Sequence, residues 1–102
     1  MELKYKKEND LLTIYFSGEL DEYSARNIKT VLDKLLIDNL NSSSVIFDLS
    51  NMSFMDSTGV GLLIGRYKKL KQYNIKSYIR GANVNAEKVI QLSGLYSIMP
   101  KY

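Results

Sequence analysis

A strand pattern that runs directly into a helix pattern dominates the middle of this sequence. Residues 45–49 (VIFDL) are apolar and rich in β-branched side chains, and polar residues bound them on both sides, at 42–44 and at 50–51. This pattern predicts a short buried strand. Downstream, apolar residues recur every three or four positions, which predicts an amphipathic helix. Its apolar stripe comprises Val60, Leu63, Ile64, Tyr67 and Leu70, whereas Arg66, Lys69 and Gln72 fall off it.

The junction between these two patterns predicts the site. Asp56 or Ser57 can accept hydrogen bonds from the first-turn amides, so we expect the helix to begin there, with Ser57 at its N-terminus. A helix N-terminus favours negative charge, and a phosphoryl group on Ser57 would bring about −1.5 to −2 charges. From spacing alone, the simpler interpretation is that Asp56, Ser57 and Thr58 only cap a helix.

Three glycines lie in or beside the predicted helix, and each costs about 0.8–1 kcal/mol relative to alanine. Gly61 and Gly65 share a helix face, so we expect another element to approach them closely, and we expect Gly59 to leave the cap region open to a partner. A phosphate-binding loop is a weaker interpretation, because no lysine follows a glycine and the glycine spacing misses the dinucleotide motif by one residue.

The composition excludes several classes of function. A chain of 102 residues is long enough for one domain. It has no histidine and no cysteine, which excludes the histidine-dependent catalytic triads and nearly all zinc sites. The net charge of +3 is too modest to indicate a nucleic-acid binder. No apolar run reaches the length of a membrane span and no signal peptide opens the chain, so we expect a cytoplasmic protein without a membrane partner.

The remaining patterns define the other elements. Alternating residues over 3–7 and 11–17, joined by a polar turn, predict an antiparallel hairpin, which Gly18 ends. Asp21 is the expected cap of a helix that runs to about Ile37. A strand is expected over 75–80, then a short helix capped by Asn83 or Asn85 and ended by Gly94, then a last strand over 95–99.

The element order ββαβαβαβ predicts an α/β domain with a mixed sheet and parallel, right-handed crossovers. Asp21 and Asp56-Ser57 both open helices that follow strands, so we expect them to share one end of the sheet.

Five separated motifs resemble landmarks of the anti-sigma factor antagonists of the STAS superfamily, and most closely of the antagonists that act in sporulation. The motifs are Asp48-Leu49-Ser50, the stretch from Phe54 to Gly61, Gly65-Arg66-Tyr67-Lys68, Gly18-Glu19-Leu20-Asp21 and Leu92-Ser93-Gly94-Leu95. The resemblance covers nearly the whole chain and implies a single STAS domain over residues 1–102. Family members usually continue into a further C-terminal helix, which this sequence, ending at Tyr102, does not include.

The resemblance implies a partner switch. In the family, the unphosphorylated antagonist binds an anti-sigma factor that is also a serine kinase, which frees the sigma factor. The kinase then phosphorylates the serine matched by Ser57, and a serine phosphatase resets the protein. ATP and Mg²⁺ belong to the kinase, so the resemblance implies no catalysis and no cofactor in this chain.

Carried over by residue, the resemblance makes Ser57 the phosphorylation site and Asp21 the aspartate beside it. We expect the partner-binding surface to comprise Asp21, Ser24, Asp56, Ser57, Thr58 and Gly59. Thr58 departs from the family, in which a serine is common at this position. A helix cap remains the simpler interpretation of Asp21.

Two other functional classes remain open. One is a STAS module that binds a small ligand or serves in a larger regulatory assembly. The other is an enzyme with Ser57 as nucleophile, which without histidine would need lysine or aspartate as its base.

Overall fold

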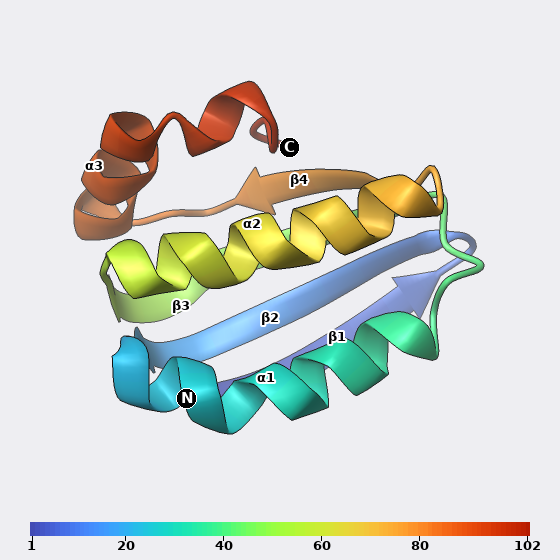
Figure 1. Cartoon of the computed structure of the whole chain (residues 1–102), viewed down its shortest axis with the longest axis horizontal. Helices are drawn as coiled ribbons and strands as arrows, with labels where there is room; N and C mark the ends of the chain where they lie inside the picture. Colours follow the sequence, from blue (N-terminus) through green and yellow to red (C-terminus); the bar gives the residue numbers. More distant parts are fainter.

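The computed structural model describes residues 1–102 as one four-stranded sheet with helices packed on it. The strands are β1 (Glu2–Glu8), β2 (Leu11–Leu20), β3 (Ser44–Met55) and β4 (Lys76–Arg80), in that order across the sheet. The helices are α1 (Glu22–Ile37), α2 (Ser57–Gln72), α3 (Val84–Ser93) and the short 3₁₀ helix η1 (Leu95–Ser97). Figure 1 shows α1 and α2 running side by side across the sheet, and α3 lying near the N-terminal end of α2. None of these helices is long and apolar enough to span a bilayer.

The predicted mixed sheet is confirmed. β1 and β2 pair antiparallel from Glu2 with Ser17 to Glu8 with Leu11, and the tight turn between them is possible because Asn9 adopts a left-handed conformation with φ 56°. β2 with β3 and β3 with β4 are parallel, as helical crossovers require.

Two central strands are longer than the sequence predicts. Gly18 does not end β2, because its φ of +103° and two irregularities in register let the chain bulge and resume pairing. The polar residues after Leu49 likewise do not end β3, since Ser17 pairs with Asn51 and Leu20 with Met55. These extra residues carry both strands to the point where α1 and α2 begin.

The predicted last strand over 95–99 is wrong. Gly94 ends α3 in a left-handed conformation as expected, but the chain then forms η1. Leu95 and Met99 are both buried, and the Met99 amide donates to the Leu95 carbonyl at 2.9 Å. Their four-residue spacing is helical, but so short an apolar stretch is also compatible with a strand. Only Lys101 bridges to the sheet, in parallel with Ile79.

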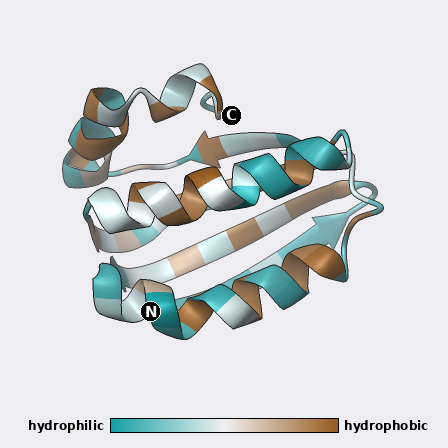
Figure 2. Ribbon diagram, viewed as in Figure 1, coloured by the Kyte–Doolittle hydropathy of each residue, from teal (hydrophilic) through white to brown (hydrophobic).

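One hydrophobic core lies between the helices and one face of the sheet. It includes Leu12, Ile14 and Phe16 of β2 and residues from all three α-helices. In Figure 2, hydrophobic and hydrophilic bands alternate along α1, as expected for a helix with one face toward this core.

Arg66 corrects the predicted pattern of α2. Although it interrupts the apolar stripe, its side chain is buried, with 6% of the residue exposed. Its Nε lies 3.1 Å from Asp33 Oδ1 on α1, and Lys69 Nζ lies 3.7 Å from the same oxygen. These ion pairs link α1 with α2, so a charged residue within the core layer joins the two helices.

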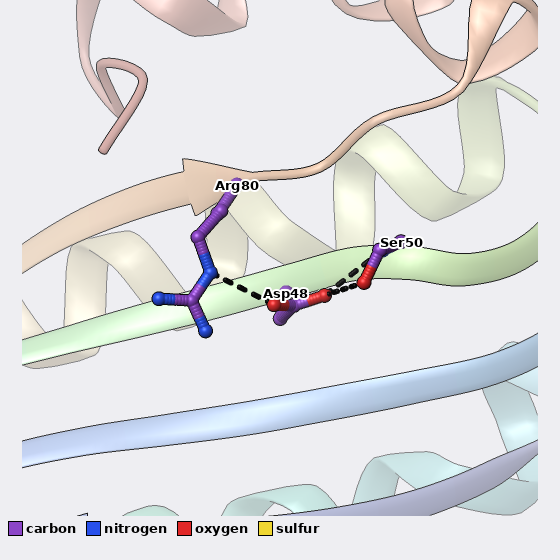
Figure 3. A network of polar contacts seen from close by, with 3 residues as sticks. All are labelled: Asp48, Ser50 and Arg80. Atoms are coloured by element: carbon purple, nitrogen blue, oxygen red, sulfur yellow. Dashed lines mark hydrogen bonds and ion pairs between the residues drawn. The ribbon is translucent and has the colours of Figure 1, made fainter.

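The sheet carries a buried carboxylate at Asp48 (Figure 3). Asp48 accepts hydrogen bonds from Arg80 Nε at 2.8 Å and from the Ser50 amide at 2.9 Å, as well as from the Ser50 hydroxyl. Burial raises the pKa of Asp48, but these hydrogen bonds and the charge of Arg80 outweigh burial, so the pKa lies below the ordinary value of 3.8. The ion pair between Asp48 and Arg80 links β3 with β4.

The three glycines of α2 have roles opposite to those expected. Gly59 is buried, and a Cβ there would lie 2.6 Å from Met55 Cγ and 3.0 Å from Leu20 Cδ2. Gly61 and Gly65 have no atom within 4 Å of a Cβ position. The close approach is therefore at Gly59, where α2 enters between the ends of β2 and β3, and the face with Gly61 and Gly65 is open.

We expect acid to destabilise the fold through Asp48. Because its pKa is lower in the folded chain than in the unfolded chain, its contribution is present above the ordinary pKa and lost as pH falls through the folded value. Denaturant unfolding of Asp48→Asn should show a loss of about 1–3 kcal/mol at neutral pH and a weaker acid dependence than the parent. Asp10→Asn, at an exposed carboxylate, is the control. An unchanged acid dependence in Asp48→Asn would contradict this prediction.

Alanine substitutions should separate the glycines. Gly65→Ala should raise the free energy of unfolding by up to about 1 kcal/mol, because alanine favours helix and the space is open. Gly59→Ala should lower the free energy of unfolding, because overpacking typically costs about 1–3 kcal/mol. Urea denaturation of both variants tests this, and equal effects of the two substitutions would show that our assignment of the close contact is wrong.

Candidate functional site

The candidate site lies where the paired ends of β2 and β3 pass into two helices. Leu20 pairs with Met55, and the Asp56 amide donates to the Leu20 carbonyl at 3.3 Å. Asp21 directly follows Leu20 and caps α1, and Asp56 directly follows Met55 and caps α2. The two aspartates therefore lie at the same end of the sheet. The predicted common location is confirmed, and Figure 1 shows that α1 and α2 begin at the same end of the sheet.

Asp21 caps α1 in a reciprocal arrangement. Asp21 Oδ1 accepts from the Ser24 amide at 2.9 Å, and Ser24 Oγ accepts from the Asp21 amide at 2.9 Å. The Ser24 hydroxyl also donates to the Glu19 carbonyl at 2.7 Å. The hydrogen bond from the Ser24 amide is the main reason that the pKa of Asp21 is lower than usual. Asp21 is therefore held as an anion, and the buried Ser24 holds it in place.

Asp56 caps α2 in a similar way. Its Oδ1 accepts from the amides of Thr58 at 2.9 Å and Gly59 at 3.2 Å. Of the two expected caps, Asp56 or Ser57, the structure selects Asp56. Ser57 becomes the first helical residue, Thr58 is exposed beside it, and Gly59 is buried beneath them.

Ser57 has an exposed side chain, and its hydroxyl makes no hydrogen bond within the protein. The Asp56 carboxylate accepts hydrogen bonds from the amides of Thr58 and Gly59 and forms none with the Ser57 hydroxyl. The Ser57 hydroxyl is therefore exposed and free to interact with another molecule.

Beside Ser57 lies an apolar groove that the sequence did not predict. A hollow of about 530 Å³ runs between the start of α2 and α3, lined by Ser57, Val60, Val89 and Leu92 among others. Leu92 is 90% exposed and Phe54 is 40% exposed. The sequence feature that could have indicated this groove is the position of Leu92, which lies off the apolar face of α3. An exposed leucine and phenylalanine next to a reactive side chain are typical of a protein-docking surface.

A second groove lies between α1 and α2, on the side of Thr58. It has a volume of about 440 Å³, and its lining includes Arg26, Lys29 and Arg66. Arg26 and Lys29 of α1 therefore border the site, and Glu22, which also lines the groove, lies 3.9 Å from Arg26. No cluster of three or more acidic, histidine or cysteine side chains that could hold a metal ion is present.

Comparisons with known proteins agree with this geometry. The STAS domain family matches residues 2–102. The anti-sigma F factor antagonist of Paenibacillus polymyxa is 28% identical over 102 residues, which are 100% of this chain and 86% of that protein. The anti-sigma-B factor antagonist of Staphylococcus aureus is 34% identical over 82 residues, which are 80% of this chain and 74% of that protein.

Solved structures give the same result. The anti-sigma factor antagonist SpoIIAA in its unphosphorylated form has a TM-score of 0.80 and 25% identity, over 99% of this chain and 88% of that one. Bacillus SpoIIAA in its phosphorylated form has a TM-score of 0.72, over 99% of this chain and 91% of that one. The four-stranded mixed sheet and its strand order match this fold. The chain therefore belongs to the STAS domain family, among the anti-sigma factor antagonists.

Proposed function

We propose that this anti-sigma factor antagonist works as a phosphorylation switch at Ser57. In the unphosphorylated form it binds an anti-sigma factor that is also a serine kinase, and so releases the sigma factor in the cytoplasm. Phosphorylation of Ser57 by that kinase ends the binding, and a serine phosphatase restores it. The names of the relatives support the antagonist role, and the two forms of SpoIIAA support a phosphorylated state.

One observation carries the proposal: the Ser57 hydroxyl is exposed and unbonded at the N-terminus of α2. The apolar groove with Phe54 and Leu92 provides a docking surface directly beside it. We assign Asp21, Asp56, Ser57 and Thr58 to the partner-binding surface. Ser24 and Gly59 contribute to this surface by fixing the starts of α1 and α2.

The charge at this site explains why phosphorylation affects the partner more than the fold. The first-turn amides and the helix dipole favour an anion by about 0.3–1 kcal/mol. The carboxylates of Asp21 and Asp56 already concentrate negative charge at the same end of the sheet. A phosphate there places further negative charge where the partner docks, and unfavourable charge contacts at an interface cost several kcal/mol.

We propose a regulatory role without catalysis by the chain itself. The Ser57 hydroxyl contacts no base, and both nearby carboxylates are engaged by backbone amides. Neither carboxylate accepts a hydrogen bond from the Ser57 hydroxyl, which is the contact that a general base would make.

Ser57→Ala should bind the cognate anti-sigma factor in the presence of ATP as tightly as the unmodified protein binds without ATP. Ser57→Asp should bind it more weakly by at least about tenfold, which corresponds to 1.4 kcal/mol. Titration calorimetry measures both. Ser43→Asp, at an exposed serine just before the opposite end of β3, is the control and should bind normally. Equal affinities for Ser57→Ala and Ser57→Asp would refute the switch, as would mass spectrometry that finds no phosphate on Ser57 after incubation with kinase and ATP.

The fold itself should tolerate the modification. Chemical denaturation of phosphorylated protein should give a free energy of unfolding within about 1 kcal/mol of the unmodified value, because the helix dipole favours the added charge. Ser57→Asp should behave in the same way. A loss of several kcal/mol would mean that the Ser57 side chain does not sit at an open helix N-terminus.

A further inference from the structure

A cavity of about 440 Å³ lies at the other end of α2, far from Ser57. Its walls are Tyr67 and Lys71 of α2, residues 74–78 from the loop and the start of β4, and Ile98 and Pro100 of the C-terminal segment. At about 1.5 Å per helical residue, Lys71 lies about 20 Å along α2 from Ser57. The cavity is therefore separate from the proposed switch.

The cavity wall contains a polar group that the fold leaves unused. Ser77 is buried, with only 4% of the residue exposed, and its hydroxyl has no hydrogen-bond partner. A buried hydroxyl without a partner is costly, so such groups are rare unless water or a ligand satisfies them.

The backbone of Ser77 faces the outer edge of the sheet. The amide of Ile79 donates to the Pro100 carbonyl, and the Ile79 carbonyl accepts from the Tyr102 amide, so these groups point to the outer edge of β4. In a parallel strand the residue two positions earlier points the same way. Ser77 therefore directs an N–H and a C=O toward the outer edge of β4, where no further strand pairs with β4.

The charged side chains that line the cavity are all positive. Lys71 and Lys76 both line the cavity, neither is in an ion pair, and no carboxylate lies among the lining residues. Lys71 Nζ lies 5.9 Å from the centre of the Tyr67 ring. The opposite walls are apolar, from Ile75, Ile98 and Pro100.

We propose that this cavity binds a small organic anion with a flat apolar body, such as an aromatic carboxylate. The anionic group lies between the ammonium groups of Lys71 and Lys76 and accepts a hydrogen bond from the Ser77 hydroxyl. The apolar body packs against Ile98, Pro100 and the tyrosine rings, which are common features of ligand cavities.

Titration of the ¹⁵N-labelled protein with 1-naphthoate, followed by NMR, tests this proposal. We expect saturable shifts confined to the cavity residues. Lys71→Gln and Lys76→Gln should each weaken binding by about tenfold, the loss typical of a charged hydrogen-bond partner. Ser77→Ala should also weaken binding without lowering the free energy of unfolding, because its hydroxyl bonds nothing in the free protein.

Two matched controls lie outside the cavity. Lys68→Gln removes an exposed charge of α2, and Ser42→Ala removes another buried hydroxyl without a partner. Both should bind 1-naphthoate normally. The proposal is overturned if 1-naphthoate shows no saturable binding up to its solubility limit, if the shifts centre elsewhere, or if neutral 1-naphthalenemethanol binds equally well.

Discussion

The parallel pairing of β2 with β3 up to their last residues is the constraint on which the site depends. Leu20 pairs with Met55, and the Asp56 amide closes the ladder onto the Leu20 carbonyl. This pairing brings two helix N-termini to one end of the sheet, each capped by an aspartate. Because Gly59 leaves room for Met55 and Leu20, α2 starts directly above the strand ends. The exposure of Ser57 follows from these packing contacts.

The order and type of most elements could be predicted from local patterns. The hairpin, the two long helices and the caps at Asp21, Asp56, Asn83 and Gly94 all carry short-range signals. Strand ends were harder, because Gly18 and Asn51 are breakers locally but are held in the ladder by their neighbours across the sheet. Residues 95–99 were predicted wrongly because so short an apolar stretch fits either a strand or a helical turn.

The site was partly predictable for a similar reason. Cap positions follow from sequence, so the places of Asp21, Asp56 and Ser57 at one end of the sheet were expected. Which glycine packs tightly depends on how α2 meets β2 and β3, which no local pattern encodes. The burial of Arg66 likewise depends on Asp33 of α1, 33 positions earlier in the sequence. The groove beside Leu92 forms only when α3 folds back next to α2.

The caps at Asp21 and Asp56 also determine how the site responds to salt. Asp21 and Asp56 are present before any modification, with Arg26 and Lys29 of α1 bordering the site, so a phosphate on Ser57 would add negative charge to a site of mixed charge. Discrimination between the two forms would then rest on long-range repulsion, which mobile ions screen over about 8 Å at physiological ionic strength. Raised ionic strength would therefore narrow the difference in partner affinity between the two proposed forms.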